Sequence, residues 1–423
     1  GMLGALVDAF LRGARRDLYF VPVSISYDRL VEEEVYKKEL LGGAKEKENL
    51  RALVRARSVL KTNYGAVHVD FGEPISLDGM LGGLRARLAH DPDDPELERE
   101  KRRFVLKLGF RLLGEVNEIS ILGAAPIAAT ALLSGARPAI LQADFLRAAE
   151  HLVAHAEREG ARFTAGLIRD RAGFVETIAF FESAGLVKRV VEEGEGEILA
   201  VPEDKRLNLD FYRNNGIHLF VVAGLASSAL LRGIPVDALG DEVRFWLELF
   251  RNEFVLPERD ALPRAIGVLV GRLRGNGGRI ESSPLVRVSA GILTHFFEAY
   301  WVAARRVLAL PEAGMPQAAL LASMRRSYAA KLMLGICSKP EGNTTVTLEN
   351  ALRRFEEMRF VRFEAAPGTK ETRVLRGDAI GYLAAVERRL EAAATAAIPG
   401  VGREGTVRVE GPAVAPLEPE ARL

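Results

Sequence analysis

The stretch "VPVSISYDRL", residues 21–30, decides the fold expected for the first part of the chain. The apolar run Leu18–Val23 leads into it, which is typical of a strand buried on both faces, as in a parallel sheet. Pro22 cannot donate a backbone hydrogen bond, so it favours an edge strand or a strand end that opens onto a pocket. Three polar-tipped side chains follow at residues 27–29.

These three side chains are candidates for a binding site. In open α/β sheets, ligands bind beyond the carboxyl ends of the strands, where Tyr27, Asp28 and Arg29 are expected to lie. The guanidinium of Arg29 is suited to holding a phosphate through its planar set of donors. Equally, Asp28 and Arg29 are suited to capping a following helix while Tyr27 packs against it. The residue pattern leaves both interpretations open.

A second strand is predicted at Ala66–Phe71, where apolar residues alternate with His68 and Asp70. Helical patterns over 29–41 and 45–64 separate the two strands, an order typical of an α/β sheet. His68 and Asp70 share one strand face and resemble an acid–base pair, but the polar outer face of a half-buried strand explains them better. Two strands leave sheet edges open, so we expect only part of a sheet here.

The rest of the chain is expected to be mainly helical. Gly82-Gly83 and the acidic, proline-broken segment 91–95 mark a linker, and long helical patterns continue to about residue 395. The fold class is therefore α/β followed by mainly α. We predict an α/β part over 1–80, a helical domain over 81–395 and a disordered tail over 396–423.

One sequence unit occurs twice in the helical region, as "FFESAGLVKRVVEEGEGEILAV" (180–201) and "RFEEMRFVRFEAAPGTKETRVL" (354–375). Identical residues fall at equal spacing in the two copies, among them Phe181/Phe355, Glu182/Glu356 and Val187/Val361. Each copy predicts a helix followed by a short β-hairpin. This is the arrangement of winged-helix modules.

Another unusual stretch is "LDFYRNNGIHLF", residues 209–220, where Tyr212, Arg213, Asn214 and Asn215 precede an apolar run. Asparagine is a good helix N-cap, so helix initiation explains part of the pattern. A buried Arg–Asn network that fixes helix orientation is the alternative, and catalysis is the least expected of the three.

Composition excludes several classes of protein. Lys and Arg number 58 against 57 Asp and Glu, so no global field indicates a nucleic-acid partner. The single cysteine, Cys337, excludes internal disulfides and fits a reducing compartment. We find no glycine-rich phosphate loop, no Cys/His metal spacing and no Gly-x-Ser-x-Gly elbow, so no cofactor is expected. The apolar runs Ile119–Ala136 and Ile217–Leu231 are interpreted as buried core helices.

Together these residues resemble the glycerol-3-phosphate and dihydroxyacetone-phosphate acyltransferase family. Residues 21–29 are similar to its fourth signature block, and "YKKELLGGAKEKE" (36–48) and "NYGAVHVDFGEPISL" (63–77) continue the similarity. Downstream, "YRNNGIHLF", "NEFVLP", "EAYWVAARR" and "TLENALRRF" are similar to the long C-terminal domain of the family.

The resemblance implies that residues 1–80 are the C-terminal part of an acyltransferase α/β domain. It implies transfer of an acyl group from coenzyme A or acyl carrier protein to glycerol 3-phosphate, the first step of phospholipid synthesis. A histidine separated by four residues from an aspartate (His-x4-Asp, with the aspartate five positions after the histidine) is the family's general base, and two arginine blocks hold the phosphate. The fourth block lines the substrate pocket, which implies this role for five residues here: Pro22, Ser24, Tyr27, Asp28 and Arg29.

The sequence departs from the family pattern at the catalytic blocks. None of its six histidines precedes an aspartate at the required spacing, and neither arginine block is present. The resemblance therefore predicts part of a glycerol-3-phosphate 1-O-acyltransferase that has no catalytic residue of its own and is inactive alone. We expect it to be cytoplasmic and peripheral on the inner face of the membrane.

Two other functions are compatible with parts of the sequence. In a non-catalytic binding module, the winged-helix-like units would contact nucleic acid. The first wing ("EEGEGE") is acidic, whereas a nucleic-acid wing should be basic, and the second carries Lys370, Arg373 and Arg376. On this charge balance no nucleic acid is expected. Alternatively, the helical domain docks on a membrane surface or partner, with Arg12–Arg16 and Lys101–Arg103 as candidate basic runs. A solvated helix face explains these two runs better.

Overall fold

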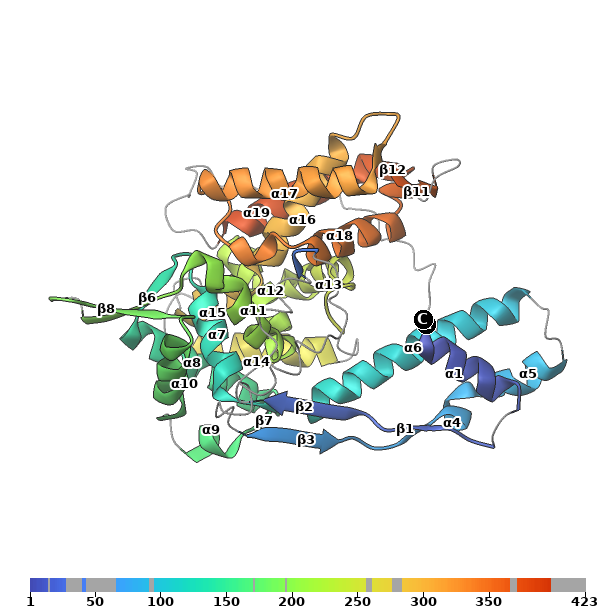
Figure 1. Ribbon diagram of the computed structural model, residues 1–423, viewed down its shortest axis with the longest axis horizontal. Helices are drawn as coiled ribbons and strands as arrows, with labels where there is room; N and C mark the ends of the chain where they lie inside the picture. Colours follow the sequence, from blue (N-terminus) through green and yellow to red (C-terminus); the bar gives the residue numbers. More distant parts are fainter. Residues whose placement is uncertain are drawn as a thin grey trace, which may run out of the picture. The chain divides into compact units, whose positions relative to one another are not determined.

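The computed structural model shows a mostly helical chain with small sheets of two or three strands (Figure 1). It describes residues 1–13, 16–27, 40–42, 66–90, 95–169, 172–194, 196–255, 261–275, 284–365 and 371–396. The described residues form two compact units. Unit 1 holds those within Gly1–Ser26 and His68–Ile121, and unit 2 holds those within Tyr27–Val67 and Leu122–Pro399.

Unit 1 packs short elements against one long helix, α6 (Pro95–Ile119). The short elements are α1 (Met2–Leu11), α4 (Leu77–Leu81), α5 (Leu84–His90), β1 (Tyr19–Phe20), β2 (Val23–Tyr27), β3 (Val67–Phe71) and β4 (Ile75–Ser76). Its core consists of buried residues from the helices: Val7, Phe10, Leu77, Leu81, Leu84, Leu97, Phe104 and Leu108. The leucine and phenylalanine spacing of α1 and α6 places these residues on one helix face each.

The strands of unit 1 differ from the parallel, doubly buried strand that the sequence predicted. β1 pairs antiparallel with β4, and β2 pairs with β3, which Figure 1 draws running in the opposite direction. Val21, Val23 and Ile25 are 48%, 38% and 52% exposed. The apolar run is exposed because side chains alternate along a strand, and only the face that carries Pro22 is packed.

Some predicted elements lie outside the described residues. These are most of the helices expected over 29–41 and 45–64, and the tail after Ala396. The domain boundaries near residues 80 and 395 stay predictions.

Unit 2 is a helical assembly around three buried helices, α7 (Ala124–Ser134), α12 (Val221–Leu231) and α16 (Thr294–Leu308). The further helices are α8 (Gln142–Arg158), α9 (Ala165–Arg169), α10 (Ala172–Ser183), α11 (Arg206–Asn214), α13 (Leu239–Leu249), α14 (Ala261–Gly275), α15 (Pro284–Ile292), α17 (Gln317–Met333), α18 (Thr345–Glu357) and α19 (Ile380–Thr395). Its 3-10 turns are η1 (Glu203–Lys205), η2 (Ile217–Phe220), η3 (Val236–Ala238) and η5 (Pro340–Gly342).

The two apolar runs singled out in the sequence form α7 and, together, η2 and α12, and their side chains lie mostly inside unit 2. Within the described ranges, no single helix is long and apolar enough to cross a membrane. One pair of helices, Glu203–Asn214 with Ile217–Leu231, passes that test by length and composition, with a bend of 82° between its halves.

The two copies of the repeated unit each form a helix and a hairpin. β8 (Lys188–Glu192) and β9 (Gly196–Ala200) follow α10, and β11 (Val361–Ala365) and β12 (Thr372–Arg376) follow α18. A third strand joins each hairpin, β6 (Ala139–Leu141) beside β9 and β10 (Met315–Pro316) beside β12. The remaining short strands are β5 (Ile121–Leu122) and β7 (Arg162–Phe163).

Two of these identical pairs, Phe181/Phe355 and Val187/Val361, occupy matching core positions. Phe181 and Phe355 are fully buried, and Val187 and Val361 are each 2% exposed. The matching spacing therefore reflects a shared way of packing a hairpin onto its helix. The further likeness to winged-helix modules stays a prediction.

Candidate functional site

The residues predicted to line a substrate pocket begin on the packed face of β2. Ser24 is buried and its Oγ lies 3.0 Å from Ser120 Oγ, whose hydroxyl donates to the carbonyl of Val116. Pro22 is buried too, and its carbonyl accepts from the backbone N–H of Gly72 at 2.8 Å. These contacts fasten β2 to β3 and to the end of α6.

Of the other three predicted residues, the structure describes only Tyr27. Tyr27 ends β2 and is 45% exposed. Asp28 and Arg29 lie outside the described residues, so neither the phosphate grip nor the helix cap is tested. The role of the whole set in substrate binding stays a prediction.

The face of the β2–β3 pair opposite to Ser24 is apolar and exposed. On β3, Val69 and Phe71 are 48% and 70% exposed, and Val23 and Ile25 present the same kind of surface on β2. Sheets normally bury the apolar face and leave the polar face to water. Here, among the described residues, the arrangement is reversed, which is typical of a surface that another layer covers.

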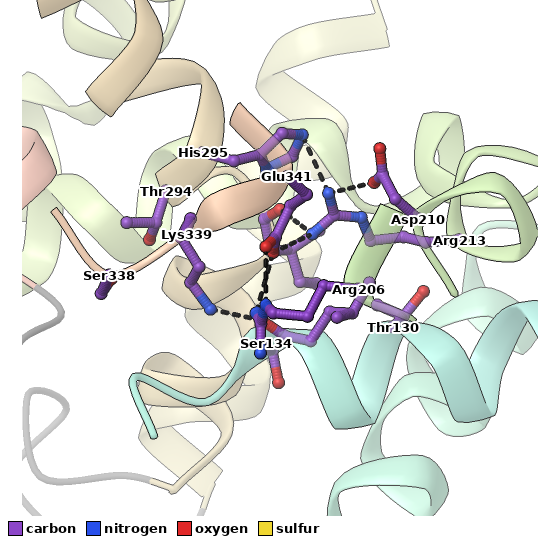
Figure 2. Close-up of polar contacts among 12 residues, drawn as sticks. Thr130, Ser134, Arg206, Asp210, Arg213, Thr294, His295, Ser338, Lys339 and Glu341 are labelled. Carbon is purple, nitrogen blue, oxygen red and sulfur yellow. Dashed lines mark hydrogen bonds and ion pairs between the residues drawn. The ribbon is translucent and has the colours of Figure 1, made fainter. Parts of the chain in front are cut away.

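A second candidate site is a set of buried charges inside unit 2, shown in Figure 2 and called here the ion network. It consists of Arg206, Asp210 and Arg213 from α11, His295 and Glu298 from α16, and Lys339 and Glu341 from the segment before α18. Its central pair is Arg206 with Glu341. Arg206 Nε and Nη2 donate to the two carboxylate oxygens at 2.8 and 2.9 Å. Bidentate geometry of this kind is the strongest form of an ion pair.

Arg213 extends the network from α11 to α16. Its side chain has no exposed surface and is paired with Asp210, and its Nη1 lies 3.7 Å from Glu341 Oε1. Its Nη2 also lies 3.0 Å from His295 Nε2. Burial, with the neighbouring charge of Arg213, holds the pKa of His295 well below its ordinary value. The imidazole is therefore neutral and accepts this hydrogen bond.

Lys339 connects the network to the end of α7, and Glu298 connects it to Tyr328 on α17. The ammonium of Lys339 donates to the carbonyls of Leu133 and Gly135, the latter at 2.7 Å, where the negative end of the helix dipole favours a cation. Burial lowers the pKa of Lys339 to about 7. Glu298 accepts from the hydroxyl of Tyr328 and from the backbone N–H of Ser338, each at 2.7 Å, while burial raises its pKa.

Glu341 stays ionised at the centre. Burial alone would raise its pKa, but Arg206, together with Lys339 and Arg213, outweighs burial and holds the pKa far below the ordinary value. A carboxylate in this environment is suited to a structural role and not to acid catalysis, because it has no proton to donate and both of its oxygens accept hydrogen bonds from Arg206. The network therefore joins α7, α11, α16 and the segment 338–342 as a clamp.

The structure thus decides between the interpretations of residues 209–220. Arg213 does belong to a buried network, and Asn214 donates weakly to Asp210 at 3.5 Å. The expected helix cap is wrong, since Asn214 ends α11, Asn215 follows it, and α12 begins after Phe220 with no side-chain cap. Glu298, Lys339 and Glu341 were missed because no local pattern relates them to Arg213. The described residues contain no His, Cys, Asp and Glu group suited to a metal ion.

Comparison with known proteins decides the family. A model described as the glycerol-3-phosphate acyltransferase C-terminal region matches residues 36–364. The chain belongs to the glycerol-3-phosphate acyltransferase family. The resemblance seen in the sequence is confirmed, and the matched region takes in the entire ion network of this acyltransferase-family chain but starts after β2.

Individual relatives carry the same name. The chain is 29% identical over 268 residues to the glycerol-3-phosphate acyltransferase of Pseudomonas entomophila, which covers 60% of this chain and 31% of that protein. It is 32% identical over 235 residues to that of Pseudomonas paraeruginosa, with 54% and 27% covered. For Pasteurella multocida the values are 28% over 235 residues, with 55% and 28% covered. The chain therefore matches about three-tenths of the length of these relatives.

Proposed function

We propose that this chain is part of a glycerol-3-phosphate 1-O-acyltransferase, which makes the first intermediate of phospholipid synthesis. The observation that carries the proposal is the family match over residues 36–364. The relatives described above, each a glycerol-3-phosphate acyltransferase by name, add support. The substrates would be glycerol 3-phosphate, or dihydroxyacetone phosphate, and an acyl thioester of coenzyme A or acyl carrier protein.

In the proposed reaction, the hydroxyl oxygen of the acceptor attacks the thioester carbonyl. A C–O bond forms, the C–S bond breaks, and the hydroxyl proton passes through a general base to the leaving thiolate. A positioned base contributes about 10²–10⁴-fold to such a step. The proposed part of this chain is to line the substrate pocket from β2 onward, through Pro22, Ser24, Tyr27, Asp28 and Arg29.

The base and the phosphate-binding arginines would come from polypeptide other than these residues. The absence of a His-x4-Asp pair from the sequence supports this, as does the small share of each relative that the chain matches. The exposed apolar face of β2–β3 supports it independently, since it is suited to packing against a further layer of an acyltransferase α/β domain.

An activity assay tests this proposal in two stages. The chain alone, given glycerol 3-phosphate and acyl-coenzyme A or acyl carrier protein thioester, is expected to show no turnover. A fusion of the upstream part of the Pseudomonas entomophila relative to this chain is expected to restore growth of a strain that lacks the activity. The upstream part alone is the control. Turnover by the chain alone, or no growth with a folded fusion, would contradict the proposal.

The proposed setting is the cytoplasm, at the inner face of the membrane, because the acylated product partitions into lipid. The alternative function, a winged-helix-like module that contacts nucleic acid, has weaker support. Its first hairpin sequence carries four glutamates within residues 192–197, next to two glycines, and acidic tips repel phosphates. Binding to duplex DNA that weakens steeply with salt would favour this alternative.

A further inference from the structure

The C-terminal end of α17 exposes three large apolar side chains within four residues. Met333 is 88% exposed, Leu334 72% and Ile336 38%. We call residues 333–336 the α17 tip. Single exposed apolar residues need no explanation, but a cluster on one turn marks an interaction surface. Figure 1 shows α17 along the outer edge of unit 2.

The α17 tip is held in place by its backbone and by the ion network. Gly335 adopts a left-handed conformation, with φ of 67°, and the N–H of Ile336 donates to the carbonyl of Lys331 at 2.9 Å. This is the geometry of a helix C-cap that ends on glycine. The next residue, Cys337, is 2% exposed, and Ser338 is bound to Glu298. The exposure of the tip is therefore a built feature of the turn and does not come from fraying.

The sequence segment that carries the tip has charged residues of one sign. Residues 313–340 contain no aspartate or glutamate, although the chain has 57 such residues among 423, about one in seven. The same segment contains Arg325, Arg326 and Lys331 on α17. The exposed residues Arg326, Ala330 and Met333 follow one another along one side of the helix. The ammonium of Lys331 lies 4.5 Å from the centre of the Trp301 ring, which fixes its position.

The shape of the tip favours some binding partners over others. Met333 and Leu334, which are 88% and 72% exposed, stand out from their surroundings, and a protruding shape of this kind does not enclose a peptide or an acyl chain. A bilayer interface needs no groove, because lipids rearrange around a protruding apolar group while their anionic head groups meet the flanking cations.

We propose that the α17 tip inserts into the surface of an anionic lipid bilayer, with Arg326 and Lys331 at the level of the head groups. The proposal rests on the proposed function for its setting, because the acylated product must enter a membrane. The test of membrane insertion involves no acyl transfer, so its result is independent of the result for the proposed acyltransferase function.

The test is sedimentation of the full chain with vesicles of phosphatidylcholine and phosphatidylglycerol (3:1) or of phosphatidylcholine alone. We expect binding to the mixed vesicles. The triple variant Met333→Ser, Leu334→Ser, Ile336→Ser is expected to lower the partition coefficient by at least about tenfold, since insertion of each large apolar side chain is favourable. The matched control Val190→Ser, Val191→Ser, which removes exposed apolar side chains from β8, is expected to leave it unchanged.

A charge variant tests the orientation of the tip. Arg326→Gln is expected to weaken binding to the mixed vesicles about fivefold at low salt and to have little effect on vesicles of phosphatidylcholine alone. The difference is expected to shrink at high salt. All substituted side chains lie at the surface, so circular dichroism should show an unchanged fold.

Three outcomes would overturn the proposal. One is no binding of the wild-type chain to the mixed vesicles. Another is binding that the triple variant retains, or that is lost instead in a Val23→Thr, Ile25→Thr variant of the exposed sheet face. The third is self-association of the wild-type chain that only the triple variant abolishes, because a second copy would then be the occupant of the tip.

Discussion

In unit 2, the stability of the fold depends strongly on single charged residues, because several of them are buried in its interior. Arg206 and Glu341 are 4% and 0% exposed, and each satisfies the other with two hydrogen bonds. Removing water from two ions costs several kcal/mol each, and the pair recovers this only while both partners are present. Loss of one partner is therefore much worse than loss of a surface ion pair.

The variant Glu341→Gln tests how much the buried ion pair matters for stability. The amide cannot neutralise Arg206, so we expect the free energy of unfolding to fall by about 3–5 kcal/mol. Urea denaturation followed by circular dichroism measures the change. Glu312→Gln, at an exposed position, is the control and should change stability by less than about 0.5 kcal/mol. Equal effects of the two substitutions would contradict the buried ion pair.

A second carboxyl, Glu253, predicts how stability depends on pH. Its oxygens accept from Tyr300 Oη at 2.9 Å and Asn350 Nδ2 at 3.1 Å, with no cation bound to it among the described contacts. Burial raises its pKa from 4.5 to about 7. Between these values the unfolded chain releases the proton while the folded chain keeps it, so this group lowers stability as the pH rises from 4.5 to 7.

Replacing Glu253 with glutamine should remove that dependence. We expect the decline in stability of Glu253→Gln between pH 4.5 and 7 to be smaller than that of the wild type by on the order of 2 kcal/mol. Unfolding in urea at a series of pH values measures it. Glu356→Gln on the exposed side of α18 is the control. Parallel pH curves for wild type and Glu253→Gln would show that the carboxyl is not protonated in the folded chain.

At the scale of elements, helices α15 and α7 pack so closely at Gly291 that there is no room for a side chain. A Cβ atom at Gly291 would lie 1.9 Å from the carbonyl oxygen of Ser134, which is backbone and cannot rotate away. This contact places α15 against the end of α7 that also receives the ammonium of Lys339. Glycine at this position therefore sets how near the two helices come.

The variant Gly291→Ala is expected to destabilise the chain by about 2–3 kcal/mol, because the two helices must separate. Thermal unfolding measures the effect. Gly267→Ala in α14 is the control, since nothing lies within 4 Å of its Cβ position, and it should stabilise by about 0.5–1 kcal/mol through helix propensity. A neutral result for Gly291→Ala would mean that α15 sits farther from α7.

At the scale of the whole molecule, the residues that the structure describes form two separate hydrophobic cores. Unit 1 buries eight apolar residues in its own cluster, and unit 2 buries a far larger set. Separate cores melt as separate cooperative units when few contacts couple them.

We therefore expect two transitions in calorimetry. Glu341→Gln should lower only the midpoint of the unit 2 transition. Leu108→Ala, which empties a fully buried position of the unit 1 core, should lower only the other, by about 2–5 kcal/mol in stability. One transition that both variants shift equally would contradict independent cores.

The sequence by itself determined the helical class of unit 2, the two hairpins and the family. Helices and hairpins depend on side-chain periods of 3.6 and 2 and on glycine turns, all of which are local. The family follows from short motifs such as residues 21–29 and 209–220, which are contiguous in the chain. Even the burial of Arg213 was among the interpretations, because an arginine beside an apolar run must find partners.

Only the tertiary structure decided which residues are the partners of Arg206 and Arg213 in the ion network. Glu341 is 135 positions from Arg206, and His295 is 82 from Arg213, so no local period relates them. The structure also decided that the face of β2–β3 with valine and isoleucine is exposed. Alternation along a strand says which side chains share a face, but burial of that face depends on what other layer of the fold lies against it.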